Sequence, residues 1–199
     1  MLDRNFNGRR VQIIGSYRRL DELTEVLEKF SYRVLKKDCL DLPDKTYMKR
    51  IVELTEEQLK MYATMKQAAL AESKGKIAST TNAMTQLMRM QQIVCGHVKM
   101  DDGSMVEIKS NRINELMSAL EEVDGKVIIW ANYIYDIEKI IQALKKTYGE
   151  DSTVAYYGAV DTNTRQKNIV LYQDENSPVR FFVGNTQTGG YGITLTAAN

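Results

Sequence analysis

Apolar positions follow a helical period in the first half of the chain and form short continuous runs in the second half. The helical period predicts two helices, at about 56–72 and about 80–95. The first begins at a capping box, in which Thr55 caps the helix and Gln58 reaches back to it. Weaker patterns predict three further segments and one turn: a strand at 11–15, a helix over about 20–30, a strand at 46–54, and a short hairpin around 101–104.

From residue 110 onward, amphipathic helices alternate with short apolar strands. The stretch KVIIWA at 126–131 is apolar along its length, which is typical of a strand buried on both faces of a parallel sheet. Repeated helix-then-strand order predicts an α/β domain with a largely parallel sheet. The other expected elements are a helix with the stripe 113–123, a helix from about 134 that ends at Gly149, a strand at 154–158, a helix at about 163–172 and a strand at 179–184.

Composition narrows the class of protein only slightly. The 199 residues carry a formal net charge of +1, so whole-chain electrostatics favours neither a nucleic acid nor a membrane as partner. Two cysteines, Cys39 and Cys95, match no metal or disulfide spacing, as is typical of a reducing compartment. No apolar run is long enough for a signal peptide or a membrane span, and we expect a cytoplasmic protein.

A glycine-rich stretch, GNTQTGGYG at 184–192, directly follows the last predicted strand. It falls at the carboxyl edge of the sheet, where open α/β sheets bind their ligands. Its glycines expose backbone amides, and Thr186 and Thr188 add hydroxyls, so the stretch is suited to phosphate. A tight turn that needs positive φ explains the same residues equally well. The chain contains no Gly-Lys-Ser/Thr, so this is not a Walker A loop.

Two other polar stretches follow predicted strands. In WANYIYD at 130–136, Trp130, Asn132 and Tyr133 suit stacking on, or donation to, a nucleic-acid backbone, although an aromatic residue at a strand end is more often part of the core. In YYGAVDTNTRQ at 156–166, we expect a helix capped by Thr162 or Thr164, with Arg165 holding the turn.

Catalytic and metal chemistry find little support in the sequence. His97 is the only histidine, and a buried, hydrogen-bonded structural role suits it better than metal binding. No Ser-His-Asp or Cys-His arrangement is credible with one histidine. We therefore predict no catalytic and no metal-binding residues. The methionines at 84–105 have the helical spacing of core residues.

Taken in order, several stretches resemble Swi/Snf-like superfamily-two DNA helicases and translocases, in the phage-type form. FSYRVLKKDCLDLPDKTY resembles the segment that closes the first motor lobe, and VELTEEQLKMY resembles the helix opening after it. LMRMQQIVCGH is similar to the family's Leu-Arg…Cys-x-His stretch, with Val98 where a proline is usual. KVIIWANY is similar to helicase motif IV and FFVGNTQTGGYGITLTAAN to the opening of motif V.

The resemblance implies a RecA-like second lobe preceded by a mainly helical connector and truncated before the last motif. It divides the chain into the tail of the first lobe (1–45), the connector (46–105) and an incomplete C-terminal lobe (106–199). Within that lobe it implies DNA-backbone contacts from four residues and a loop at the nucleotide cleft shaped by three glycines. The DNA-contacting residues are Asn132, Gly158, Thr186 and Thr188, and the loop glycines are Gly189, Gly190 and Gly192.

Cofactors and partners also follow from the resemblance. The parent protein is expected to use ATP and Mg²⁺, whereas this segment binds neither tightly and does not hydrolyse ATP alone. Expected partners are double-stranded DNA and the first helicase lobe, in a bacterial or phage-infected cell, together with self-association through the truncated sheet edge. The alternative is a non-enzymatic RecA-like adaptor whose helical connector binds a protein partner.

Overall fold

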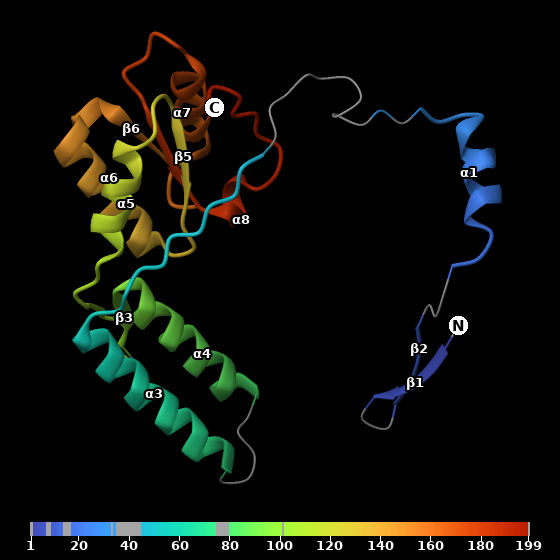
Figure 1. Ribbon diagram of the computed structural model, residues 1–199, viewed down its shortest axis with the longest axis horizontal. Coiled ribbons are helices and arrows are strands. Elements are labelled where there is room, and N and C mark those ends of the chain that lie inside the picture. Colours follow the sequence, from blue (N-terminus) through green and yellow to red (C-terminus); the bar gives the residue numbers. More distant parts are fainter. Residues whose placement is uncertain are drawn as a thin grey trace. The chain divides into compact units, whose positions relative to one another are not determined.

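The computed structural model describes residues 2–6, 9–13, 17–32, 34, 45–74, 80–100 and 102–198. These residues belong to two compact units, Met1–Lys49 and Arg50–Asn199 (Figure 1). In the first unit, β1 (Leu2–Phe6) pairs antiparallel with β2 (Arg9–Ile13), and α1 (Leu20–Glu28) follows. The strand and helix expected here are confirmed within the described residues, whereas β1 was not predicted. The sequence also predicts a break at Pro43, which disfavours helix at Leu42, and this position lies outside the described residues.

The second unit contains every element predicted after residue 55. Its elements are α3 (Glu56–Lys74), α4 (Thr80–Cys95), β3 (His97–Lys99), β4 (Met105–Glu107), α5 (Arg112–Glu121), β5 (Val127–Trp130), α6 (Ile134–Tyr148), a 3-10 turn (Glu150–Ser152), β6 (Thr153–Tyr156), α7 (Thr162–Gln173), β7 (Phe181–Gly184) and α8 (Thr186–Gly189). The expected hairpin is confirmed, because β3 and β4 pair antiparallel. Gly149 ends α6, as predicted, with a φ of 100° that favours glycine.

A three-stranded parallel sheet forms the centre of this unit, in the order β5-β7-β6. Both faces are covered, which explains why the strands are mostly apolar. One face packs against α5 and α6, and its buried residues are Leu120, Ile129, Ile137, Ile140, Leu144, Phe181 and Val183. The other face packs against α7 and the segment 193–198, and its buried residues are Val154, Tyr156, Tyr172, Val179 and Phe182. The predicted α/β class is confirmed.

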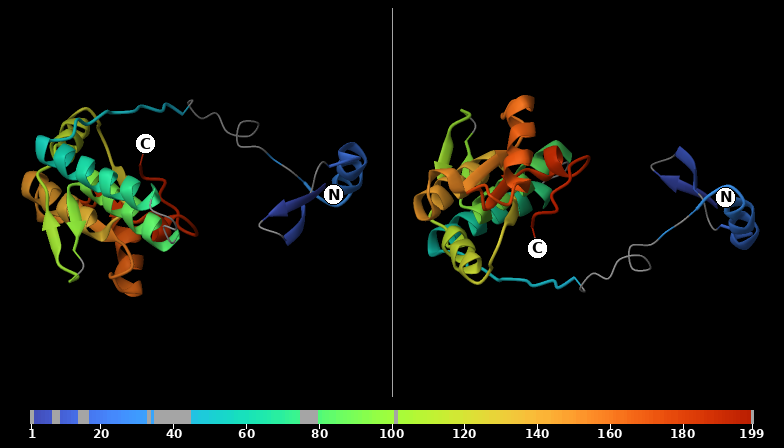
Figure 2. Two further views of the ribbon diagram at one scale, coloured as in Figure 1. Left: turned by 90° about the horizontal axis from the view of Figure 1, so that it is seen from below. Right: turned by 90° about the horizontal axis from the view of Figure 1, so that it is seen from above.

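The helices α3 and α4 form a helical hairpin and lie side by side (Figure 2). The predicted capping box opens α3: the backbone N–H of Thr55 donates to Oε1 of Gln58 at 3.1 Å, and the N–H of Gln58 donates to Thr55 Oγ1 at 3.3 Å. Gln58 is fully buried and also donates to the carbonyl oxygens of Ile93 (2.8 Å) and Val94 (3.1 Å). One side chain therefore joins the start of α3 to the end of α4.

The strand predicted at 46–54 is absent, since residues 45–55 form extended backbone outside any strand. Three of its large apolar side chains are exposed: Tyr47 at 86%, Met48 at 78% and Ile51 at 92%. Arg50 holds the stretch instead. It forms ion pairs with Glu115 of α5 (3.1 Å) and with Glu122, the residue directly after α5. Alternating polarity predicted a strand, but a strand also requires a neighbour, and none pairs with these residues in the described structure.

A second correction concerns the methionines of α4. Helical spacing predicted a core position for them, but Met84 is 65% and Met88 53% exposed, beside Leu87 at 63%. They form an apolar stripe on the surface of α4.

None of the helices in the described parts of the chain is long and apolar enough to cross a membrane. The expected domain boundaries at 45/46 and 105/106 stay predictions.

Candidate functional site

The three parallel strands end at the same level, which brings three loops together at one edge of the sheet. Trp130, Gly184 and Tyr156 are in register as the last residues of β5, β7 and β6. Every sequence-predicted site residue lies in one of the loops that follow. Asn132 follows β5, Gly158 follows β6, and the residues from Thr186 to Gly192 follow β7. The predicted position at the carboxyl edge is confirmed, and it is the usual place for ligands in open α/β sheets.

The indole ring of Trp130 lies in a slot between two glycines. A methyl group at position 184 would lie 2.8 Å from Trp130 Cζ3, and one at position 189 would lie 2.6 Å from Cη2. Both distances are shorter than a carbon–carbon contact of about 3.5–4.0 Å. The slot therefore requires glycine on both sides. It connects the end of β5 directly to α8, a contact between residues more than fifty positions apart.

Asn185, which was not among the predicted site residues, joins the loops. Its side-chain Nδ2 donates to the carbonyl oxygens of Ala131 (3.2 Å) and Asn132 (2.8 Å), while its Oδ1 accepts from the N–H of Gln187 at 2.8 Å. Its backbone N–H donates to Tyr156 O at 3.1 Å. One residue thus binds backbone from all three loops. An available signal was that asparagine favours the position just before a helix.

The glycine-rich loop begins as a short helix, where the sequence suggested either a phosphate-binding stretch or a tight turn. Thr186 starts α8 with its side chain exposed, and Thr188 is half-buried. Gly190 donates its N–H to Thr186 O at 2.8 Å, and a methyl group at 190 would lie only 2.5 Å from that oxygen. Gly192 has a φ of 74°, a conformation that favours glycine.

The remaining predicted residues are less constrained. Asn132 is exposed, although its carbonyl oxygen is held by Asn185. Gly158 is exposed, and a methyl group there would meet no atom within 4 Å. Packing therefore does not require glycine at 158. Thr162 and Thr164 do not cap α7, because Asp161 does so by accepting from the N–H of Thr164 at 3.0 Å.

Arg165 has a structural position, as predicted. It lies on α7, where its Nη2 donates to Thr162 Oγ1 at 3.1 Å. Its guanidinium carbon lies 5.6 Å from the ring centre of Tyr156, close enough for a cation–π contact. These contacts fix the turn between β6 and α7.

Beside Asn132, a hollow of about 290 Å³ opens between β5, the start of α6 and the end of α4. Charges of both signs line it, among them Arg112, Asp136 and Lys139. Lys139 pairs with Glu107 at 2.7 Å, and this hydrogen bond lowers the pKa of Glu107. Burial raises the pKa of the Cys95 thiol, so this cysteine is not activated as a nucleophile.

His97 is fully buried next to this hollow. Its ring packs against Tyr133 and Tyr135, with ring centres 5.1 Å and 4.8 Å away. Nδ1 lies 3.1 Å from Asp136 Oδ1, an ion-pair distance, but neither ring nitrogen forms a hydrogen bond with the described residues. The expected structural role agrees with these contacts, whereas the expected hydrogen bonds are not found among the described residues. No group of three or more metal-ligating side chains occurs in the described residues.

We expect Asn185→Asp to lower the free energy of unfolding by about 2 kcal/mol. Aspartate keeps the acceptor for Gln187, but its second oxygen would face the carbonyl oxygens of Ala131 and Asn132. Urea denaturation followed by circular dichroism measures the change. Asn163→Asp, at an exposed position in the first turn of α7, is the matched control and should change stability little. Equal stabilities for the two variants would contradict the joining role of Asn185.

A parallel sheet with helices on both faces and joined polar loops at its carboxyl edge is an open α/β arrangement, and the solved structures given below share it as a RecA-like lobe. The family model for the SNF2-related domain matches residues 3–100. A Mycoplasma genitalium protein named an uncharacterized ATP-dependent helicase is 28% identical over 176 residues, which cover 87% of this chain and 16% of that protein. The chain therefore spans about a sixth of that relative's length.

Two solved structures from Sulfolobus solfataricus are similar to the chain. The SWI2/SNF2 ATPase core in complex with double-stranded DNA is 26% identical, with a TM-score of 0.62 over 93% of this chain and 41% of that one. The SWI2/SNF2 ATPase C-terminal domain is 24% identical, with a TM-score of 0.59 over 74% of this chain and 66% of that one, and shows the same fold. Together with the family match, they confirm the resemblance to Swi/Snf-like superfamily-two helicases.

Proposed function

We propose that this chain is the C-terminal part of an ATP-dependent DNA helicase or translocase, in which it contacts the DNA backbone and forms one wall of the ATP cleft. The observation that supports this most strongly is the likeness, over 93% of the chain, to an ATPase core solved with double-stranded DNA. The proposed partners are duplex DNA and a first helicase lobe. The proposed setting is the cytoplasm of a bacterial or phage-infected cell.

In this proposal, the exposed polar groups at the sheet edge contact phosphates. Thr186 and Thr188 offer hydroxyls, and Asn132 an amide, while Gly158 leaves room for the DNA backbone to approach. Gly189 has a second role besides shaping the loop: its close contact with Trp130 holds α8 against the sheet. Gly190 and Gly192 then set the path of the loop at the nucleotide cleft.

ATP and Mg²⁺ belong to the parent protein in this proposal. The chain has no Gly-Lys-Ser/Thr and no Asp-Glu-x-His, so the phosphate cradle and the metal-binding acidic motif must come from another segment. Bound Mg²⁺ and ATP would supply the phosphoryl-transfer chemistry, while the residues described above orient the loop beside them. The chain alone is predicted to have no ATPase activity, which a phosphate-release assay with and without duplex DNA checks.

We expect weak binding to duplex DNA that decreases steeply with salt. The salt dependence comes from phosphates that Lys and Arg side chains neutralise, and about four such contacts beside the polar ones would lower the affinity about 10²-fold between 50 and 200 mM salt. Fluorescence anisotropy with a labelled 20-base-pair duplex, about two helical turns, measures this. Substituting both Thr186 and Thr188 with alanine should weaken binding about tenfold at low salt. Thr147→Ala, at an exposed position of α6 away from the sheet edge, is the control and should leave affinity unchanged.

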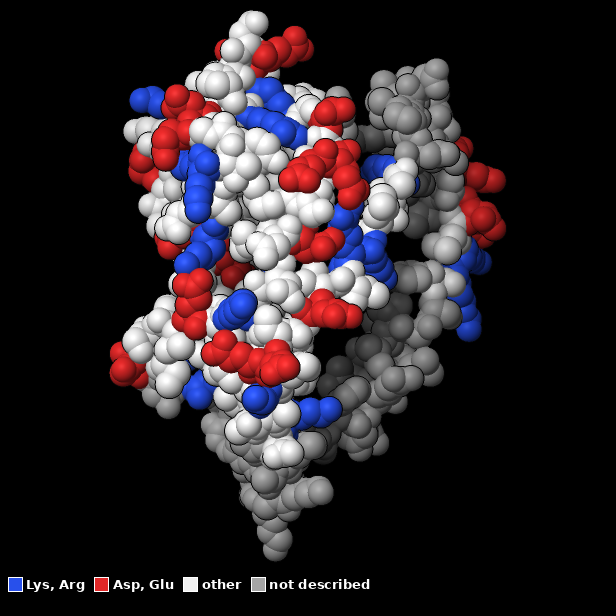
Figure 3. All heavy atoms as spheres, turned by 60° about the vertical axis from the view of Figure 1, so that its left-hand side comes forward, with Lys and Arg blue, Asp and Glu red and all other residues white. Residues whose placement is uncertain are grey.

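The adaptor alternative makes the opposite prediction: neither the unsubstituted chain nor the variant with alanine at 186 and 188 should show salt-dependent DNA binding. One observation favours it: on the face shown in Figure 3, the Lys and Arg side chains of the described residues are interspersed with Asp and Glu and form no continuous basic surface there. Anisotropy that stays at the value of free DNA at 50 mM salt would therefore reject the motor proposal and favour the adaptor.

A further inference from the structure

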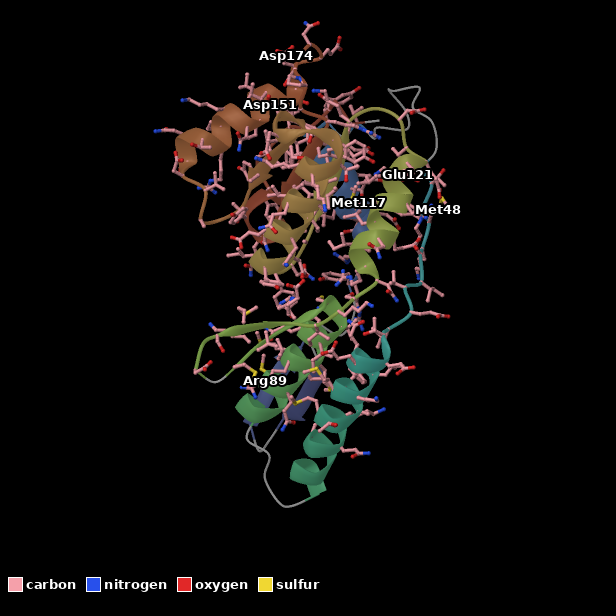
Figure 4. The ribbon with its side chains drawn as sticks, turned by 90° about the vertical axis from the view of Figure 1, so that its left-hand side faces the viewer. Met48, Arg89, Met117, Glu121, Asp151 and Asp174 are labelled. Atoms are coloured by element: carbon pink, nitrogen blue, oxygen red, sulfur yellow. The ribbon has the colours of Figure 1, made fainter. Side chains whose placement is uncertain are left out.

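A second hollow, of about 410 Å³, lies between α3, α4 and β3, away from the sheet edge. Its walls are almost entirely apolar and include the methionines Met61, Met65 and Met100. Sulfur atoms are visible between the two helices in Figure 4, near the labelled Arg89. Met100 is 48% exposed, so part of this apolar wall faces solvent. We call this hollow the connector groove.

The charged side chains that line the connector groove are all basic: Lys60, Arg89 and Lys99. No carboxylate lines it within the described residues. Lys60 and Lys99 are exposed and form no ion pair in the described part of the chain. This one-sided charge contrasts with the hollow beside Asn132, where acidic and basic groups are mixed.

The exposed methionines of α4 are not part of this groove. Met84, Leu87 and Met88 are each more than half exposed, but at 3.6 residues per turn they lie on the side of α4 opposite to Arg89 and Ile93, which line the groove. Methionine side chains are flexible and polarizable, so a wall made of them adapts to the shape of a bound apolar side chain.

We propose that the connector groove binds an acidic amphipathic helix of a partner protein. A groove between two helices suits a third helix, which inserts apolar side chains spaced three or four residues apart. Carboxylates beside those anchors would pair with Lys60 and Lys99. In the proposed complex, the apolar wall would supply most of the affinity for the partner helix. The basic rim would select a partner with acidic side chains. This inference does not depend on DNA or ATP binding.

The test uses a fluorescein-labelled, 18-residue model helix with leucine on one face and glutamate on the other. Fluorescence anisotropy with the full chain should show saturable binding. The double substitution Lys60→Glu and Lys99→Glu should weaken it at least tenfold. The matched control is the pair Lys66→Glu and Lys109→Glu, which reverses two exposed lysines outside the groove lining and should leave affinity almost unchanged.

Three further measurements separate this occupant from others. Met100→Lys should abolish binding, whereas Met100→Leu should preserve it, and circular dichroism confirms that both variants fold. A peptide with lysine in place of glutamate should not bind, and equal binding by both peptides would overturn the acidic partner. A concentration-dependent dimer in light scattering that disappears in Met100→Lys would assign the groove to a second copy and overturn the proposal, as would failure of the acidic peptide to bind.

Discussion

Phe182→Ala should lower the free energy of unfolding of the second unit by about 3–5 kcal/mol. Phe182 is fully buried at the centre of β7, in the middle strand of the sheet. Three aromatic rings surround it, with centres at 6.0 Å for Trp130, 5.3 Å for Tyr156 and 5.3 Å for Tyr172. The three surrounding rings cannot close over the space left by a deleted side chain without displacing the ends of the strands, so a cavity should remain.

Urea denaturation measures this loss, with circular dichroism and tryptophan fluorescence as two probes. Trp130 is the single tryptophan, so its fluorescence reports on this unit alone. Phe182→Leu keeps most of the volume and should cost less than about 1.5 kcal/mol. Val170→Ala, at a position of α7 that is 68% exposed, should cost almost nothing. A loss for Phe182→Ala as small as that for Val170→Ala would contradict the central role of Phe182 in the core.

Much of the fold was predictable because local patterns and tertiary burial agree in it. The stretch at 126–131 is apolar on both alternating faces, and β5 indeed has a helix layer on each side. Thr55 and Gln58 lie three residues apart, so their capping box needs no distant partner. Gly149 ends α6 for an equally local reason, because its φ of 100° is accessible mainly to glycine.

The errors arose where distant residues decide the outcome. Whether the stretch at 46–54 is a strand depends on a neighbouring strand, and whether Met84 and Met88 are buried depends on what covers α4. Asp161, rather than a following threonine, caps α7, which residue spacing alone did not distinguish.

The candidate site was predictable as a place but not as an arrangement. Strand ends and glycines located the carboxyl edge, since parallel strands must bring their following loops together. The slot around Trp130 joins residues from β5, β7 and α8, and no local pattern links them. Asn185 was missed for the same reason, because two of its partners, Ala131 and Asn132, lie more than fifty residues earlier in the chain.

Gly184→Val should lower the free energy of unfolding by about 3 kcal/mol, the upper end of the usual cost of overpacking. A methyl group at 184 already lies 2.7 Å from the carbonyl oxygen of Tyr156 and 2.8 Å from Trp130 Cζ3. The oxygen belongs to the neighbouring strand and also accepts the N–H of Asn185, so it has little freedom to move. Trp130 is 39% exposed, so its indole ring is the group that should leave.

Fluorescence distinguishes this outcome from general unfolding. If valine expels the indole from its slot, the emission of Trp130 should shift to longer wavelength in native buffer while circular dichroism stays native. Gly158→Val is the matched control, because position 158 lies in the neighbouring loop, after β6, and has open space around it. It should change neither stability nor emission. If Gly184→Val left both unchanged, the indole would not lie between the two glycines, and the connection from β5 to the glycine-rich loop would have to run through Asn185 alone.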